Sequence, residues 1–66
     1  MRIWVNGEAR EVSEASTVAD LLRELALAGK RVAVEVNAGI VPRSQHADTR
    51  LQPGDTVEIV HAIGGG

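Results

Sequence analysis

The sequence has no cysteine, no phenylalanine, no tyrosine and a single tryptophan among its 66 residues. Without cysteine, the chain can form neither a disulfide nor a thiolate metal site, and it cannot carry sulfur or an acyl group on a thiol of its own. Nucleic-acid-binding proteins usually combine a basic excess with aromatic side chains that stack on bases. Here seven Lys and Arg stand against nine Asp and Glu, so we expect no nucleic-acid partner.

Long apolar runs are also missing. The N-terminal stretch has three consecutive apolar residues, Ile3 to Val5, before a turn, so no signal peptide is expected. No run approaches the roughly 20 apolar residues that span a bilayer. We therefore expect a soluble cytoplasmic protein with no membrane partner. Because 44% of the residues are hydrophobic, most of the chain should fold as one small domain.

The beginning of the chain predicts a β-hairpin. Asn6-Gly7 lies between two short strands and is the strongest short signal for a two-residue hairpin turn. If Ile3 and Val5 face the core, the two-residue period of a strand turns Trp4 to the opposite face. The alternative register would bury Trp4. We favour an outward Trp4, which would mark a docking surface for another protein.

One helix is expected, from Val18 to Ala28. Thr17 is placed to cap its N-terminus, with Asp20 three residues later as an acidic form of the capping box. Gly29 would end the helix as its C′ residue. The apolar residues at helical spacing, which form a single stripe for the core, are Val18, Leu21, Leu22 and Leu25.

Turn residues separate the later strands. Residues 37–39 should turn the chain into a short strand that ends at Pro42, and residues 51–55 carry Pro and Gly at the positions of a type II turn. Between them, residues 43–50 are polar and predict an irregular loop. His46 lies in this loop, and we interpret it as a solvated side chain without a catalytic role.

These elements predict an α+β fold in which four to five strands are covered on one face by a single helix, because no other segment has a matching apolar stripe. The chain divides into a folded domain, residues 1–61, and a C-terminal tail, residues 62–66. The expected strands are residues 1–5, 8–12, 32–37, 40–41 and 56–61.

The tail ends in three consecutive glycines, and Gly66 carries the α-carboxylate. Glycines at a terminus are most often only a frayed end. Alternatively, a thread without side chains could enter a narrow active site of another protein and present its carboxylate there for activation. No nucleophile, base or metal ligands are arranged in a known pattern elsewhere, so we expect no catalytic residue and no metal. The domain is therefore expected to be a substrate of enzymes rather than an enzyme.

Six short segments follow one another along the whole chain: Val5-Asn6-Gly7-Glu8, Thr17-Val18-Ala19-Asp20-Leu21-Leu22, Val34-Glu35-Val36-Asn37, Ile40-Val41-Pro42-Arg43, Gly54-Asp55-Thr56-Val57-Glu58-Ile59 and Gly65-Gly66. In this order the chain resembles the ubiquitin-like β-grasp sulfur carriers, and among them the ThiS family of thiamine biosynthesis. Molybdopterin-synthase small subunits share the fold and the Gly-Gly end, but typically have prolines just before it. One departure from the thiamine carriers is His46, where several of them have a Trp.

The resemblance implies a mixed β-grasp sheet whose first and last strands are adjacent and parallel. The carboxylate of Gly66 would be adenylated with ATP by an E1-like enzyme (ThiF). Sulfur from a donor fed by a cysteine desulfurase would then convert it to a thiocarboxylate. Thiazole synthase (ThiG) would take this sulfur into the thiazole ring of thiamine. The chain would bind no cofactor itself and would be a monomer when free.

The tail would reach a partner's active site through Gly64 and Gly65. Ordering glycines on binding costs conformational entropy, so the folded domain must contribute docking contacts. We expect an apolar patch formed by Trp4, Ala33 and Val60. The charged residues expected to frame this patch are Arg43, Glu35 and Glu58.

Three alternatives remain open at this point. Within the same fold, the chain could be a molybdopterin-type sulfur carrier or a ubiquitin-like protein modifier. From a different functional class, it could be a β-grasp RNA-binding module. The net charge of −2, the single aromatic residue and a sequence that stops at Gly66 argue against the RNA-binding module.

Overall fold

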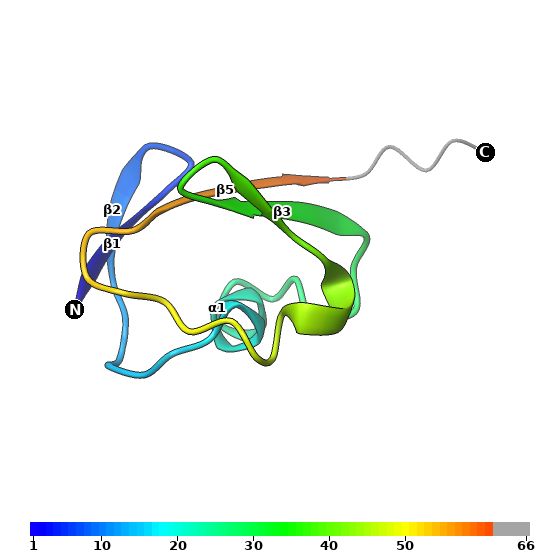
Figure 1. Cartoon of the computed structure of the whole chain (residues 1–66), viewed down its shortest axis with the longest axis horizontal. Coiled ribbons are helices and arrows are strands. Elements are labelled where there is room, and N and C mark those ends of the chain that lie inside the picture. Colours follow the sequence, from blue (N-terminus) through cyan, green and yellow to red (C-terminus); the bar gives the residue numbers. More distant parts are fainter. Residues whose placement is uncertain (62–66) are drawn as a thin grey trace.

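A computed structural model describes residues 1–61, in which five strands form one sheet with the order β2-β1-β5-β3-β4 (Figure 1). The strands are β1 (Arg2–Val5), β2 (Glu8–Glu11), β3 (Val32–Val36), β4 (Gly39–Val41) and β5 (Thr56–His61). One α-helix, α1 (Val18–Glu24), and one short 3-10 helix, η1 (Arg43–Gln45), connect them.

The sheet is mixed. Strands β1 and β5 are parallel neighbours, whereas the pairs β1–β2, β3–β4 and β3–β5 are antiparallel. Helix α1 lies across one face of the sheet (Figure 1). This arrangement confirms the expected β-grasp fold, with five strands and a single α-helix in the described residues.

Two tight turns of the same kind close the two hairpins. Asn6 and Gly7 have φ angles of 49° and 84°, and Asn37 and Ala38 have 50° and 69°. Two consecutive residues with positive φ are the signature of the type I′ turn, whose twist matches that of the flanking strands. The first turn was expected. In the second, Gly39 belongs to β4 rather than to the turn, so β4 is longer than predicted.

Helix α1 begins as the sequence predicted. The hydroxyl of Thr17 accepts the backbone N–H of Asp20 at 3.1 Å, and the carboxylate of Asp20 accepts the N–H of Thr17 at 3.0 Å. These reciprocal bonds complete a capping box. The hydrogen bond from the Thr17 backbone, with that from its hydroxyl, holds the pKa of the half-exposed Asp20 carboxyl below its usual value.

The other end of α1 differs from the prediction. The helix ends at Glu24 rather than at Ala28, and Gly29 is not its C′ residue. Ala26 takes that position instead, with a left-handed φ of 60°. Gly29 also has a positive φ, 79°, but it lies in the loop that follows. The sequence rule that favours glycine at this position was therefore misleading here.

A Schellman motif ends the helix. The N–H of Ala26 donates to the carbonyl of Arg23 at 3.1 Å, and the N–H of Leu27 donates to the carbonyl of Leu22 at 2.7 Å. These are the two bonds that define the motif, and an apolar contact usually accompanies them. Leu27 is half-buried and packs against the core. Burial of Leu27 therefore explains why alanine accepts a backbone conformation that L-residues rarely adopt.

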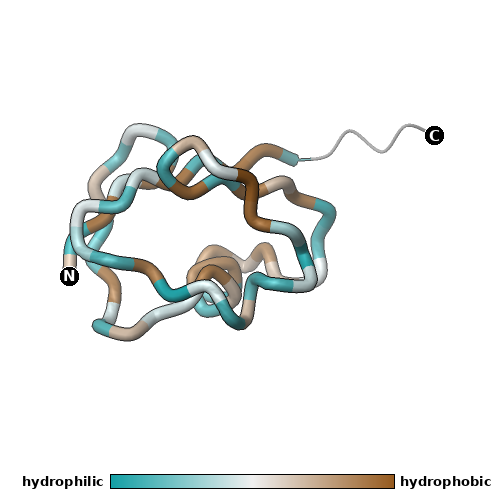
Figure 2. The backbone as a smooth tube through the Cα atoms, viewed as in Figure 1, coloured by the Kyte–Doolittle hydropathy of each residue, from teal (hydrophilic) through white to brown (hydrophobic). Residues whose placement is uncertain are grey.

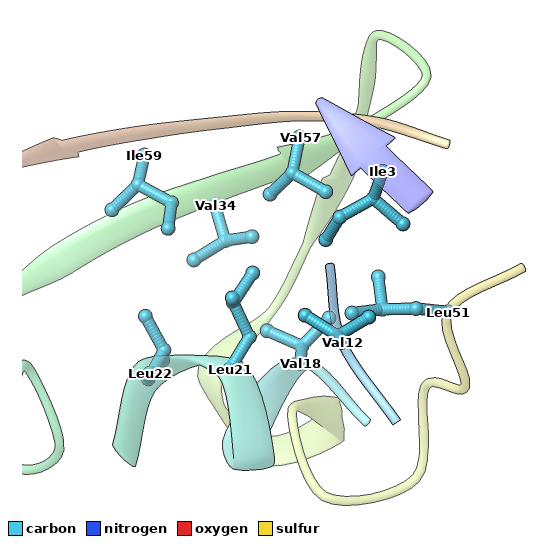
Figure 3. Close-up of a cluster of buried hydrophobic side chains, with 9 residues drawn as sticks. All are labelled: Ile3, Val12, Val18, Leu21, Leu22, Val34, Leu51, Val57 and Ile59. Carbon is cyan, nitrogen blue, oxygen red and sulfur yellow. The ribbon is translucent and has the colours of Figure 1, made fainter. Parts of the chain in front are cut away.

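The core lies between the sheet and α1. Figure 3 shows side chains of β1, β3 and β5 pointing toward those of the helix, with Val12 and Leu51 closing one end. Buried and exposed residues alternate through most of β5, so one face of the sheet is buried. Figure 2 shows hydrophobic stretches, in brown, in the strands and in α1 on either side of the core. The nine buried hydrophobic residues are Ile3, Val12, Val18, Leu21, Leu22, Val34, Leu51, Val57 and Ile59.

The long connection between β4 and β5 is more ordered than expected. It starts with η1 and contains His46, whose side chain is only 8% exposed. The Nε2 of His46 donates to the carbonyl of Val41 at 3.1 Å, and its own carbonyl accepts the N–H of Ala19 in α1 at 3.0 Å. The prediction of a solvated histidine was wrong, because η1 reverses the chain and turns this side chain inward. The type II turn is confirmed by Gly54, with a φ of 84°.

The two turn asparagines extend the pairing of β5 on both sides. On the β1 side, Asn6 Oδ1 accepts the N–H of Ile59 at 2.8 Å, and Asn6 Nδ2 donates to the Ile59 carbonyl at 3.1 Å. On the β3 side, Asn37 Oδ1 accepts the N–H of Thr56 at 3.0 Å, and Asn37 Nδ2 donates to the carboxylate of Asp55 at 3.0 Å. Each amide takes the place of a backbone partner.

Replacing Asn6 by glycine tests this role without straining the turn. The variant keeps the positive φ but loses two hydrogen bonds to Ile59, so we expect the free energy of unfolding to fall by about 2 kcal/mol. Hydrogen exchange of the Ile59 amide should also become faster. Denaturant unfolding measures the first effect and NMR the second. Ala38→Gly is the matched control, because Ala38 has the same left-handed backbone without side-chain bonds, and it should not destabilise. Equal stability of the two variants would contradict this account.

Ala26→Gly should stabilise the domain. Glycine adopts left-handed φ without the penalty that a Cβ imposes, so we expect a gain of about 1 kcal/mol in the free energy of unfolding. Ala28→Gly is the control in the same loop, since Ala28 is also exposed but has no positive φ. That change should be neutral or destabilising. Thermal unfolding of both variants distinguishes the two cases, and a loss of stability in Ala26→Gly would refute the Schellman assignment.

Candidate functional site

Strand β5 carries the chain to the last described residue, His61. It is the central strand of the sheet, with β1 on one side and β3 on the other. The register pairs His61 with Val32, at the start of β3, so pairing continues to the end of the strand. The glycines predicted to be functional, Gly64, Gly65 and Gly66, lie outside the described residues and follow directly on β5 in the sequence.

The face of the sheet opposite α1, which we call the outer face, exposes large apolar side chains. Trp4 is 42% exposed, Val60 60% and Ile40 76%. The outward orientation predicted for Trp4 is therefore confirmed. The register places Ala33 directly opposite Val60. Exposed apolar groups on adjacent strands are typical of a protein-interaction surface.

Most of these apolar side chains form one cluster, and Trp4 lies apart from it. A shallow hollow of about 190 Å³ is lined by Ala33, Ile40 and Val60 together with two glutamates. Trp4 does not line it. The register pairs Trp4 with Thr56, four residues along β5 from Val60, which corresponds to about 13 Å in a strand. The structure therefore brings Ala33 and Val60 together and places Trp4 at the other end of the outer face.

Two carboxylates oppose each other across the outer face. Glu35 on β3 is the register partner of Glu58 on β5, and both are exposed and line the same hollow. Within residues 1–61, neither has a cationic partner within 4.0 Å. Like charges directly opposite in a sheet are destabilising. The pair therefore gives the outer face a local negative charge that a basic side chain of a partner would neutralise.

Arg43 lies elsewhere. Pro42 ends β4, and η1 then carries the chain toward the helix side of the molecule. There Arg43 lines two hollows with Leu22, Gly29 and His46. The structure does not bring Arg43 to the hollow of the outer face, where the sequence analysis had grouped it with the two glutamates.

Ile40 is the residue of this surface that the sequence analysis missed. Residues 40–41 were predicted as a short strand without an assigned face. The two-residue turn at Asn37 and Ala38 sets the register, which places Ile40 opposite Glu35. Because Glu35 is on the outer face, Ile40 is too. Counting pairs back from a type I′ turn could have found it.

The described residues contain no group of three or more His, Asp or Glu side chains able to hold a metal ion. Over the same range, no helix is long and apolar enough to cross a bilayer.

Comparison with known proteins identifies the family. The model described as "ThiS family" matches residues 3–66, nearly the whole chain. The chain belongs to the ThiS family. The family match favours the thiamine carriers over the molybdopterin-type alternative.

Individual ThiS proteins resemble the chain over its full length. It is 35% identical to the sulfur carrier protein ThiS of Escherichia coli, over 100% of both chains. It is 38% identical to that of Bacillus subtilis, over 97% of this chain and 98% of the relative. The crystal structure of the thiamine biosynthesis protein ThiS from Geobacter metallireducens matches with a TM-score of 0.86 at 35% identity, covering all of both chains.

Other relatives are much longer. The chain is 47% identical over 66 residues to a thiazole synthase of Paramagnetospirillum magneticum and 41% identical to one of Magnetococcus marinus. It spans about one fifth of the length of each of these proteins. In these relatives, a ThiS-like segment is thus part of the same chain as the thiazole synthase.

Proposed function

We propose that the carboxylate of Gly66 is the group that carries sulfur. A carboxylate is a poor electrophile, so an oxygen of Gly66 would first attack the α-phosphorus of ATP and release pyrophosphate. A sulfur nucleophile would then displace AMP, which leaves with one of the former carboxylate oxygens. The product, a thiocarboxylate, is a softer nucleophile than the carboxylate. Membership in the ThiS family supports this assignment. The absence of cysteine supports it too, because the chain has no thiol that could carry the sulfur instead.

The folded domain would act as the part that enzymes bind, so the chain is a protein co-substrate rather than an enzyme. The observation that carries this proposal is the central position of β5, which leads directly into the glycine-rich end. Residues 62–66 could extend by roughly 16–18 Å, at 3.3–3.6 Å per residue. This length would allow Gly66 to enter a narrow active site while the domain stays outside.

Two enzymes and a sulfur source would complete the cycle. An E1-like adenylating enzyme (ThiF) would use ATP, a cysteine desulfurase would feed the sulfur donor, and thiazole synthase (ThiG) would accept the sulfur for the thiazole ring. The thiazole synthases that contain a ThiS-like segment support the last partner, because covalent linkage raises the effective concentration of two modules that work together. Since adenylation consumes ATP, we place the carrier in the cytoplasm.

The outer face would supply the docking contacts. The apolar cluster around Ile40 and Val60 offers area to bury, and the opposed carboxylates Glu35 and Glu58 offer a charge that can select a basic partner. Interfaces of this type combine an apolar centre with a polar rim. Trp4 would extend the contact toward β1, because its exposed aromatic ring belongs to the residue class that contributes most to interfaces.

Removal of Gly66 tests the proposed chemistry. With the adenylating enzyme and ATP, the full chain should support exchange of labelled pyrophosphate into ATP. The chain without Gly66, or with one residue added after it, should reduce this exchange by at least about 100-fold, since the carboxylate is displaced by one residue from the reacting phosphorus. Circular dichroism should show an unchanged fold. Normal adenylation of the truncated chain would refute the proposal. Intact-protein mass spectrometry of the chain from cells should show one terminal oxygen replaced by sulfur.

Trp4→Glu tests the docking role of the outer face. Because Trp4 is partly exposed, its loss should lower the free energy of unfolding by about 1 kcal/mol. The apparent affinity for the adenylating enzyme should fall more, by about tenfold, because a charge replaces an aromatic contact. Trp4→Phe is the control that keeps most of the apolar area and should bind nearly normally. If Trp4→Glu unfolded the domain, or left the affinity unchanged, Trp4 would not be a docking residue.

A further inference from the structure

The basic side chains of this protein differ in whether they form ion pairs within residues 1–61. Within residues 1–61, three arginines form ion pairs with carboxylates: Arg2 with Glu11, Arg10 with Glu24 and Arg23 with Asp20. The other four cations, Lys30, Arg31, Arg43 and Arg50, have no carboxylate within 4.0 Å in this part of the chain. Three of these four lie together, although the chain as a whole is acidic.

They line a groove on the helix side. One hollow of about 250 Å³ is bordered by Lys30, Arg31 and Arg43, and a second of about 240 Å³ adjoins it. No Asp or Glu is among the residues that line either hollow. The floor is partly apolar, because Ala19, Leu27, Val32 and Ala47 also contribute to one hollow or the other. We call this surface the basic groove; the two hollows share Leu22, Gly29, Arg43 and His46.

The basic groove lies beside the base of the tail. Val32, which lines it, is the register partner of His61, the last residue of β5. Figure 1 shows the start of β3, η1 and the end of β5 at the same end of the molecule. The acidic pair on the outer face, Glu35 and Glu58, lies on the other side of the sheet. The point where the tail leaves the domain is thus flanked by a positive surface on one side and a negative surface on the other.

We infer that the basic groove docks an acidic segment at the mouth of the active site of the adenylating enzyme. This inference rests on the proposed function, because an enzyme that receives Gly66 must cover the end of the domain from which the tail leaves. A segment with carboxylates and apolar side chains fits cations that surround an apolar floor, whereas free phosphate would gain nothing from that floor. Opposite charges on the two sides of the tail then determine one rotational orientation of the carrier about the tail axis. Such complementarity mainly raises the rate of association and excludes wrong orientations.

Charge reversal tests this docking. In the pyrophosphate exchange assay with the adenylating enzyme, we expect the double variant Lys30→Glu/Arg31→Glu to raise the KM for the carrier by about tenfold or more, with kcat within twofold. Arg43→Glu should raise KM in the same direction, because Arg43 lines both hollows of the groove. The KM of the unchanged chain should increase with ionic strength, and that of the double variant should increase less. Circular dichroism checks that each variant folds.

Arg50→Glu is the matched control, since Arg50 is also exposed and without an ion pair in residues 1–61 but does not line the groove. A similar rise in KM for Arg50→Glu, or an unchanged KM for the groove variants, would overturn the inference and leave the proposed function intact. Competition by inorganic phosphate at constant ionic strength would also overturn it, because the groove would then be a small-anion site. Absence of exchange with the unchanged chain would overturn both proposals.

Discussion

The hydrogen bonding of β5 on both edges is the interaction on which the rest of this small protein depends. Two neighbouring strands and two asparagine side chains satisfy its backbone from Thr56 to Ile59, and the pairing with β3 continues to His61. The strand therefore gives the glycine-rich end a defined starting point. It also determines the two faces of the sheet, because its alternating side chains enter the core on one side and lie on the outer face on the other.

In residues 1–61 a single hydrophobic core fills the space between the sheet and α1. Nine hydrophobic residues between the sheet and α1 make up that core, so the remaining chemistry has to be on the surface. The described surface is divided in a way that suits a carrier. One side of the tail base has exposed apolar groups with two opposed carboxylates. The other has three cations that have no carboxylate within 4.0 Å in residues 1–61. A partner that receives the tail, as proposed, would contact the outer face and the basic groove at the same time. Those two contacts would orient the domain without a large interface.

The prediction of local elements from sequence was largely correct, and its errors have physical causes. The hairpin at Asn6, the capping box at Thr17 and the outward orientation of Trp4 follow from short-range rules and were confirmed. The predicted end of α1 was wrong because burial of Leu27 imposed a left-handed conformation on Ala26. His46 was misplaced because its burial depends on a 3-10 helix that folds the loop back onto α1. In both cases tertiary packing outweighed a local preference.

The sequence by itself determined most of the elements, the fold and the family, because periodicity and turn residues indicate local structure and the ordered motifs extend along the whole chain. Only the tertiary structure decided which side chains meet. It opposed Glu35 to Glu58, exposed Ile40 beside Val60 and gathered Lys30, Arg31 and Arg43 around one groove. Those residues lie on different strands and loops, and their positions depend on strand register and on the path of η1. A local sequence pattern does not show which side chains meet, because the contacts of a charged side chain depend on how the backbone places distant segments beside it.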